Sequence, residues 1–135
     1  MPTASSEVTN GTVGDLMTAG ILTCSPSAPL RTVARMMATH RVHAIVVFGH
    51  QDTLLPWGVV SDLDLVGALD SGANASAIAA SPVVTVTADD TLICAAQLMR
   101  EHSTAHLIVV ADAASPIPIG VLSSLDVVRA VAEGG

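Results

Sequence analysis

Apolar residues occur along the chain in two arrangements, unbroken runs and helical spacings. The runs Ala44–Phe48 and Leu107–Val110 contain no alternating polar positions, which is typical of strands buried on both faces. Apolar residues at i, i+3, i+4 and i+7 predict two amphipathic helices, each packing one stripe against a sheet. The stripes are Leu30, Val33, Ala34 and Met37, and then Leu92, Ala95, Ala96 and Met99. Shorter strands are predicted at Ile21–Cys24, Trp57–Val60, Val83–Val86 and Ile119–Leu122.

Polar residues and glycines predict the ends of these elements. Short side chains that accept a hydrogen bond from a first-turn amide are expected to cap two short lead-in helices and the two long helices. These caps are Thr12, Ser27, Asn74 and Asp89. Closing helices are predicted at Ser61–Leu69, ended by Gly72, and at Leu125–Ala132. Polar loops at Gly49–Thr53 and Asp112–Pro118 separate the last two strands of each half.

The chain repeats itself. Sliding the sequence by 62 positions aligns Val13–Leu69 with Ala75–Val131 without a gap. Identical pairs along this alignment include Thr23/Thr85, Met37/Met99, His40/His102, Gly58/Gly120, Ser61/Ser123 and Asp64/Asp126. A repeat of this length indicates two copies of one supersecondary unit, ordered helix, strand, helix, strand, strand, helix. We therefore predict an α/β (α+β) fold with repeats at 12–72 and 73–133, after a flexible N-terminal segment at 1–11.

One motif, Gly-x-x-Ser-x-x-Asp, occurs at the same place in both repeats, at 58–64 and 120–126. We interpret each copy as a strand that enters a turn at Gly and is followed by a helix that opens at Ser. First-turn amides have no intrahelical acceptor, so they can face a ligand. The alternative is a capping box, in which Ser and Asp only satisfy those amides. Duplication of the motif with its preceding strand favours a binding role.

Composition and charge narrow the classes of function. Half of the residues are hydrophobic and the only aromatic residues are Phe48 and Trp57, so we predict an aliphatic core. Twelve acids against five arginines give a net charge of −7, which disfavours nucleic acids and anionic membranes as partners. Cys24 and Cys94 lie in no metal-binding spacing and are predicted to be free, buried thiols in a reducing cytoplasm. No stretch predicts a membrane span or an export signal.

The histidines raise the question of a metal site. His40 and His43, and likewise His102 and His106, have ligand-like spacings. His40 and His102, however, occupy equivalent helix ends, where a histidine interacts favourably with the helix dipole, and no acid or cysteine completes a ligand set. No nucleophile with an oriented base is evident, so we predict neither a metal site nor an enzyme.

With this order established twice, the sequence closely resembles a tandem pair of cystathionine-β-synthase (CBS) domains, a stand-alone Bateman module. The resemblance rests on 15–18 (Asp-Leu-Met-Thr), 21–23 (Ile-Leu-Thr), the Leu-x-x-x-Ala-x-x-Met helix, and the doubled Gly-x-x-Ser-x-x-Asp motif. It implies two repeats related by a pseudo-twofold axis, with sheets packed together and clefts between the repeats. Such clefts commonly accept AMP, ADP, ATP or S-adenosylmethionine, and the family implies no required cofactor.

The resemblance also implies roles for individual residues. Asp64 and Asp126 would bind the ribose diol, because a carboxylate offers two acceptor oxygens to two hydroxyl donors. The phosphate or tail would be bound by Ser61, Ser123, His43 and His106. The base would be flanked by Leu22, Thr23, Val84 and Thr85.

The sequence departs from the family pattern at several positions. Val46 and Ile108 replace a usual proline, and histidine rather than lysine or arginine precedes the second strand. A histidine changes charge within the physiological pH range, so it supplies positive charge only part of the time. Asp62 adds negative charge beside the first site, whereas Ser124 stands at the equivalent position of the second. We therefore expect the two sites to differ and the second to tolerate phosphate better.

Three hypotheses about function follow. The first is a cytoplasmic, homodimeric regulatory module that senses an adenosyl ligand and signals to an unknown protein partner. The high mean hydropathy of +0.61 favours a homodimer that covers apolar helix surface. The second is a ligand-free structural or dimerisation module. The third is a metal or redox sensor that uses the histidines and cysteines. Ligand identity, the number of occupied sites, the regulated partner and the dimer orientation stay open.

Overall fold

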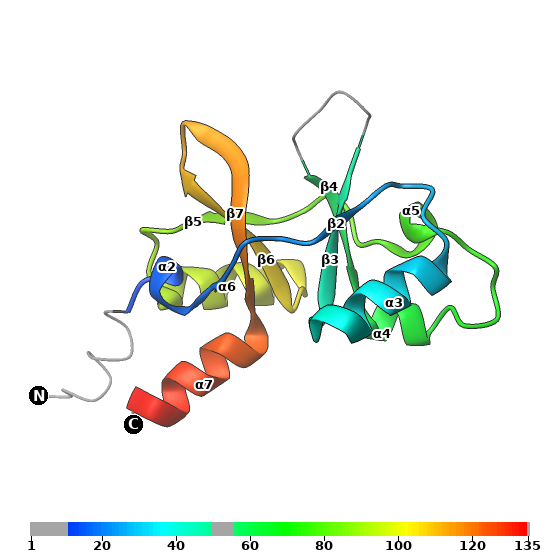
Figure 1. Cartoon of the computed structure of the whole chain (residues 1–135). Helices are drawn as coiled ribbons and strands as arrows, with labels where there is room; N and C mark the ends of the chain where they lie inside the picture. The colour runs from blue at the N-terminus through cyan, green and yellow to red at the C-terminus, as the bar shows by residue number, and fades with distance from the viewer. Residues whose placement is uncertain (1–10, 50–55, 135) are drawn as a thin grey trace, which may run out of the picture. The chain divides into compact units, whose positions relative to one another are not determined.

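The computed structural model describes residues 11–49 and 56–134 and divides the chain into two compact units (Figure 1). The central unit comprises Ile21–Val83, and the terminal unit combines Met1–Gly20 with Val84–Gly135. Each unit contains helices and one β-sheet, so the predicted mixed α/β class with two repeats is confirmed. The two units do not coincide with the two repeats. The lead-in segment of each repeat packs in the unit that contains the rest of the other repeat.

The central unit contains a three-stranded sheet in the order β2-β3-β4. β2 (Thr23–Cys24) runs parallel to β3 (Ala44–Phe48), which pairs antiparallel with β4 (Pro56–Ser61). Its helices are α3 (Leu30–His40), α4 (Asp62–Val66) and α5 (Ala75–Ile78), and α3 and α4 lie side by side (Figure 1). Part of the predicted loop Gly49–Thr53 lies outside the described residues.

The terminal unit contains a four-stranded sheet in the order β1-β7-β6-β5. β5 (Thr85–Thr87) runs parallel to β6 (His106–Asp112), and β7 (Ser115–Ser123) pairs antiparallel with both β6 and β1 (Thr18–Ala19). The helices of this unit are α2 (Val13–Leu16), α6 (Leu92–His102) and α7 (Ser124–Gly134). α7 continues directly from the end of β7 (Figure 1).

Each unit has its own aliphatic core, to which the exchanged lead-in segment contributes a fully buried residue. Val13 of α2 packs in the core of the terminal unit with Ala95 and Met99 from the predicted stripe of α6. Ala75 of α5 packs in the core of the central unit with Val33 and Met37 of α3. Burial of these apolar side chains is the main favourable contribution to the stability of both units.

The predicted caps of the short lead-in helices are confirmed, but those of the long helices are wrong. Thr12 and Asn74 accept hydrogen bonds from the amides of Asp15 and Ala77. α3 instead begins after Pro29 without a side-chain cap, and Ser27 Oγ lies 3.2 Å from Ser25 Oγ.

In α6 the capping residue is Thr91 rather than Asp89. The Thr91 hydroxyl lies 3.1 Å from the Cys94 amide and accepts its hydrogen bond. The error in both long helices has one cause, because the helix begins two residues later than predicted in each repeat.

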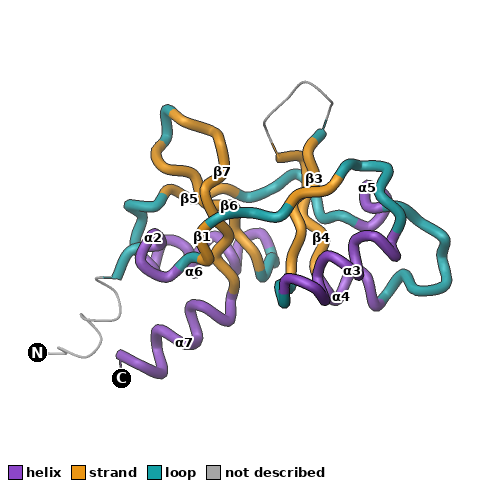
Figure 2. The backbone as a smooth tube through the Cα atoms, viewed as in Figure 1, coloured by secondary structure: helices purple, strands orange, loops and turns teal. Residues whose placement is uncertain are grey.

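The predicted loop Asp112–Pro118 is also mostly strand. β6 and β7 form a hairpin in which Asp112 pairs with Ser115 (Figure 2). Asp112 Oδ1 accepts a hydrogen bond of 2.9 Å from the Ala114 amide, so the aspartate itself closes the turn. The segment is rich in Ala, Ser and Pro, a composition typical of loops, and for this reason the start of β7 was not predicted.

Candidate functional site

The glycine of each repeated motif lies inside a strand, not at a turn as predicted. Gly58 is in β4 and Gly120 is in β7. A Cβ atom on Gly58 would lie 2.9 Å from the Ala80 carbonyl oxygen, and one on Gly120 would lie 2.6 Å from the Thr18 carbonyl oxygen. Glycine is therefore needed at both positions, because the lead-in segment of the other repeat pairs antiparallel with the last strand at close backbone contact.

Ser and Asp of each motif form a complete capping box. In the central unit, Ser61 Oγ accepts from the Asp64 amide at 3.1 Å, and Asp64 Oδ2 accepts from the Ser61 amide at 2.9 Å. In the terminal unit, the same two bonds join Ser123 and Asp126 at 3.1 and 2.8 Å. Both aspartates are half-buried.

The capping boxes engage only one oxygen of each carboxylate. Within residues 11–49 and 56–134, Oδ1 of Asp64 and Oδ1 of Asp126 accept no hydrogen bond. An ionised carboxylate oxygen has lone pairs for further donors. The capping interpretation is thus correct in the folded chain, and it leaves each aspartate with one acceptor for a ligand.

The candidate residues of the central unit lie at the end of its sheet where β2 and β3 begin and β4 ends, and this end is called its edge below. The Val46 amide donates to the Leu22 carbonyl, and Thr23 pairs with Val46. Ala44, next to His43, pairs with Ser61 at the other side of β3. The start of β2, the start of β3 and the end of β4 therefore bring together Leu22, Thr23, His43, Ser61 and Asp64.

The terminal unit repeats this arrangement. The Ile108 amide donates to the Val84 carbonyl at 2.9 Å, and Thr85 pairs with Ile108. His106 pairs with Ser123 across β6 and β7. The residues gathered at this edge are Val84, Thr85, His106, Ser123 and Asp126. Each unit thus gathers all five of its sequence-predicted site residues.

The edge of the central unit contains one side-chain contact that sequence reasoning missed. His43 Nδ1 lies 3.1 Å from Asp62 Oδ2, with the side chains 69% and 53% exposed. Asp62 Oδ1 also accepts a hydrogen bond of 2.8 Å from the Leu63 amide. The antiparallel pairing of Ala44 with Ser61 places His43 beside Asp62, so a register assignment for β3 and β4 would have revealed the contact.

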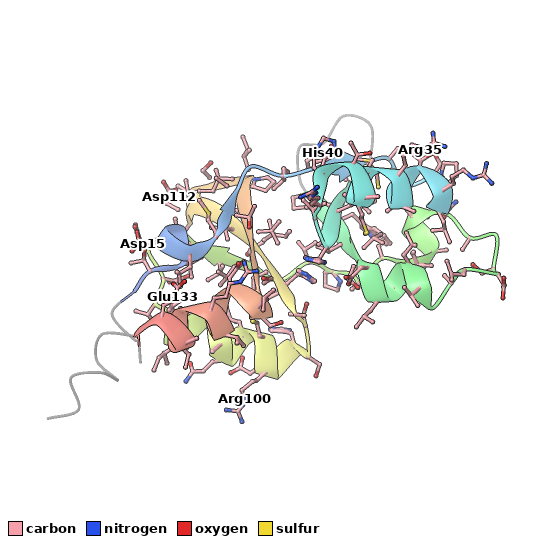
Figure 3. The ribbon with its side chains drawn as sticks, turned by 60° about the horizontal axis from the view of Figure 1, so that its bottom comes forward. Asp15, Arg35, His40, Arg100, Asp112 and Glu133 are labelled. Atoms are coloured by element: carbon pink, nitrogen blue, oxygen red, sulfur yellow. The ribbon has the colours of Figure 1, made fainter. Side chains whose placement is uncertain are left out.

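No group of three or more metal-ligating side chains occurs in the part of the chain that the structure describes. His40 and His102 end α3 and α6, as predicted, and are exposed; Figure 3 shows His40 on the same helix as Arg35. Cys24 and Cys94 are free, and each is half-buried. Burial raises the pKa of the Cys24 thiol, which keeps it protonated and poorly nucleophilic.

Among the described residues, no helix combines the length and the apolar character that a bilayer crossing needs.

A model of the CBS domain family matches residues 13–71 and 75–133. A homoserine O-acetyltransferase from Methanosphaerula palustris is 30% identical over 123 residues, which are 90% of this chain and 24% of that protein. The chain therefore spans about a quarter of the length of that relative.

Solved structures show the same fold. The CBS domain protein PAE2072 from Pyrobaculum aerophilum, in complex with AMP, is 28% identical, with a TM-score of 0.72 over 90% of this chain and 98% of that one. CBSX2 in complex with AMP is also 28% identical, with a TM-score of 0.71 over 91% and 97%. The CBS domain pair of protein MJ0100, in complex with 5-methylthioadenosine and S-adenosyl-L-methionine, has a TM-score of 0.80 at 18% identity, covering 92% and 98%.

Proposed function

Because the chain belongs to the CBS domain family, we propose that it is a regulatory module that binds an adenosyl compound and signals the bound state to a protein partner. The candidate ligands are AMP, ADP, ATP and S-adenosylmethionine. Two solved family members at 28% identity are complexes with AMP. One observation carries the proposal. In both units the repeated motif ends in an aspartate, Asp64 or Asp126, that keeps one carboxylate oxygen outside the capping box.

In this proposal the aspartates bind the ribose. Oδ1 of Asp64 or Asp126 accepts a hydrogen bond from a ribose hydroxyl, while Oδ2 stays bonded to the amide of Ser61 or Ser123. This hydrogen bond from the backbone amide fixes the carboxylate before the ligand binds, so the side chain loses little conformational freedom on binding.

The remaining candidates surround the rest of the ligand. Leu22 and Thr23 in the central unit, and Val84 and Thr85 in the terminal unit, contact the base through backbone and apolar groups. The tail or phosphate lies near the Ser hydroxyl and the histidine of each edge. These residues are Ser61, His43, Ser123 and His106.

We propose that the chain itself is not an enzyme. The homoserine O-acetyltransferase relative does not alter this, since the chain matches only 24% of that protein. Catalysis would require a nucleophile or base held by an orienting partner. The Ser61 and Ser123 hydroxyls instead accept helix amides, and burial keeps the Cys24 thiol protonated.

We propose further that the protein is a cytoplasmic homodimer. Apolar side chains at equivalent positions are exposed along α4, the turn after it, and α7. These side chains form one apolar stripe in each unit, with Leu63, Val66 and Leu69 in the central unit and Leu125, Val128 and Val131 in the terminal unit. A second copy of the chain would remove this surface from water.

The alternative is a structural or dimerisation module that binds no ligand. One observation favours it: both capping boxes are complete without a ligand, so the motif has a role in folding alone. Dimerisation through the apolar stripes of the two units would then be the whole function.

Thermal unfolding in the presence of millimolar adenosyl compounds separates the two. A ligand at about 100 times its dissociation constant should stabilise the folded state by about 2.7 kcal/mol. Asp64→Ala or Asp126→Ala should remove the shift of its own site, whereas Asp90→Ala should not. Asp90 is the matched control because its carboxylate also accepts a backbone amide, that of Thr87 at 2.9 Å. Absence of a shift with every compound would favour the ligand-free module.

A further inference from the structure

The first-turn amides of α4 are all used within the protein. The Asp62 amide donates to the His43 carbonyl at 2.9 Å. The Leu63 amide donates to Asp62 Oδ1 at 2.8 Å, and the Asp64 amide donates to Ser61 Oγ at 3.1 Å. A phosphate at this edge would find no free amide, contrary to the expectation from the motif.

The equivalent turn of α7 differs at one amide. The Ser124 amide donates to the Ala105 carbonyl at 2.8 Å and the Asp126 amide to Ser123 Oγ at 3.1 Å, as in α4. The Leu125 amide has no acceptor among the described residues, because Ser124 replaces the aspartate that binds it in the other repeat. The difference between the Leu63 and Leu125 amides therefore comes from a single side chain.

Asp62 also changes the charge at its edge. Its Oδ2 is paired with His43, but both side chains are more than half exposed, and an exposed pair of this kind adds little to stability. Asp62 thus places a carboxylate two residues from Asp64, where the terminal unit has the uncharged Ser124. A neighbouring carboxylate repels an anionic ligand group and attracts a cationic one.

We propose that Asp62 determines the ligand class of the two sites: the central unit binds adenosyl compounds with an uncharged or cationic tail, and the terminal unit binds those with a phosphate. This inference rests on the proposed function, since it assigns the tail preference of the same sites. Asp62 acts by occupying the Leu63 amide and by repelling phosphate.

Three probes that share base and ribose test it by isothermal titration calorimetry: adenosine, AMP and 5′-amino-5′-deoxyadenosine. Asp126→Ala isolates the central site, and Asp64→Ala isolates the terminal site. In the isolated central site, Asp62→Ser should raise the affinity for AMP about tenfold, leave adenosine unchanged, and weaken the amino compound. Asp62→Asn, which removes the charge but keeps an oxygen, should give much of the same gain.

The converse substitution is the matched control. In the isolated terminal site, Ser124→Asp should lower the affinity for AMP about tenfold without affecting adenosine. An AMP-to-adenosine affinity ratio that neither substitution changes would overturn the inference while leaving the proposed function intact. Failure of all three probes to bind the wild-type protein would overturn the proposed function, and this inference with it.

Discussion

Gly120 lies directly against Thr18, so that a Cβ atom at position 120 would stand 2.6 Å from the Thr18 carbonyl oxygen. The same relationship joins Gly58 to Ala80 at 2.9 Å in the other unit. In both cases the glycine belongs to the last strand of one repeat and the carbonyl to the lead-in segment of the other. Close backbone contact is thus a duplicated feature of the fold, and it explains the first residue of the repeated motif.

Gly58→Ala and Gly120→Ala should each destabilise the protein by about 1 to 3 kcal/mol, because the added methyl group meets backbone that cannot move away cheaply. Gly67→Ala is the control: its Cβ would lie 3.5 Å from the Leu63 carbonyl oxygen, an ordinary contact, and its backbone is helical. Urea denaturation measures the difference. Equal stability of all three variants would contradict the close contact.

Ser123→Ala should cost about 0.5 to 2 kcal/mol of folding free energy, because it removes the acceptor of the Asp126 amide. Ser124→Ala should be close to neutral, since Ser124 is exposed and contributes no side-chain bond in the described part of the chain. Chemical denaturation of both variants checks this. A larger loss for Ser124→Ala would refute the capping role.

The Cys24 thiol should resist alkylation. Because burial raises its pKa, the folded chain favours the protonated thiol. The resulting contribution to stability is present below the ordinary thiol pKa of about 8.5 and is lost as the pH rises through the raised value. In a Cys94→Ser variant, iodoacetamide should react more slowly with folded protein than with urea-unfolded protein at the same pH. Equal rates would show that burial does not protect Cys24.

Leu63→Asp and Val128→Asp should abolish self-association without unfolding the chain, since these side chains are 78% and 60% exposed. Ile93→Asp is the control, because Ile93 is an exposed apolar residue of α6 that belongs to neither apolar stripe. Sedimentation velocity across micromolar concentrations measures the assembly state. A wild-type protein that sediments as a monomer throughout this range would contradict the proposed homodimer.

Most of the fold could be predicted because its signals are local and occur twice. Val33 and Met37 follow helical spacing and are buried, and Ile45, Val46 and Val47 are a buried strand, as expected. The predicted cap of α6 is wrong because several capping residues stand close together before the helix, and sequence alone does not choose between Asp89 and Thr91. The predicted cap of α3 is wrong because that helix begins only after Pro29, which has no capping side chain.

The candidate site was predictable as a set of residues but not in its contacts. The repeat aligned Asp64 with Asp126, and the sheets bring the expected neighbours to one edge. Strand register, which pattern alone does not give, decides that His43 contacts Asp62. The role of Gly58 depends on which segment pairs with β4, a long-range relationship that a single sequence does not contain.

Substituting the aspartates alone has a mixed effect, because Asp64 and Asp126 cap helices in the absence of ligand. Removing hydroxyls from the ligand avoids this difficulty. AMP and its 2′,3′-dideoxy analogue differ only in the ribose diol, so their affinity ratio reports hydrogen bonds to that diol.

The most direct test is therefore calorimetric titration of both nucleotides into wild-type protein and into the Asp64→Ala/Asp126→Ala double variant. We predict that wild-type protein binds AMP at least about tenfold more tightly than the dideoxy analogue, since a hydrogen bond to a charged group is worth about 1.5 to 3 kcal/mol. The double variant should lose this preference. Equal binding of the two nucleotides to wild-type protein, or an unchanged preference in the double variant, would contradict ribose recognition by the aspartates.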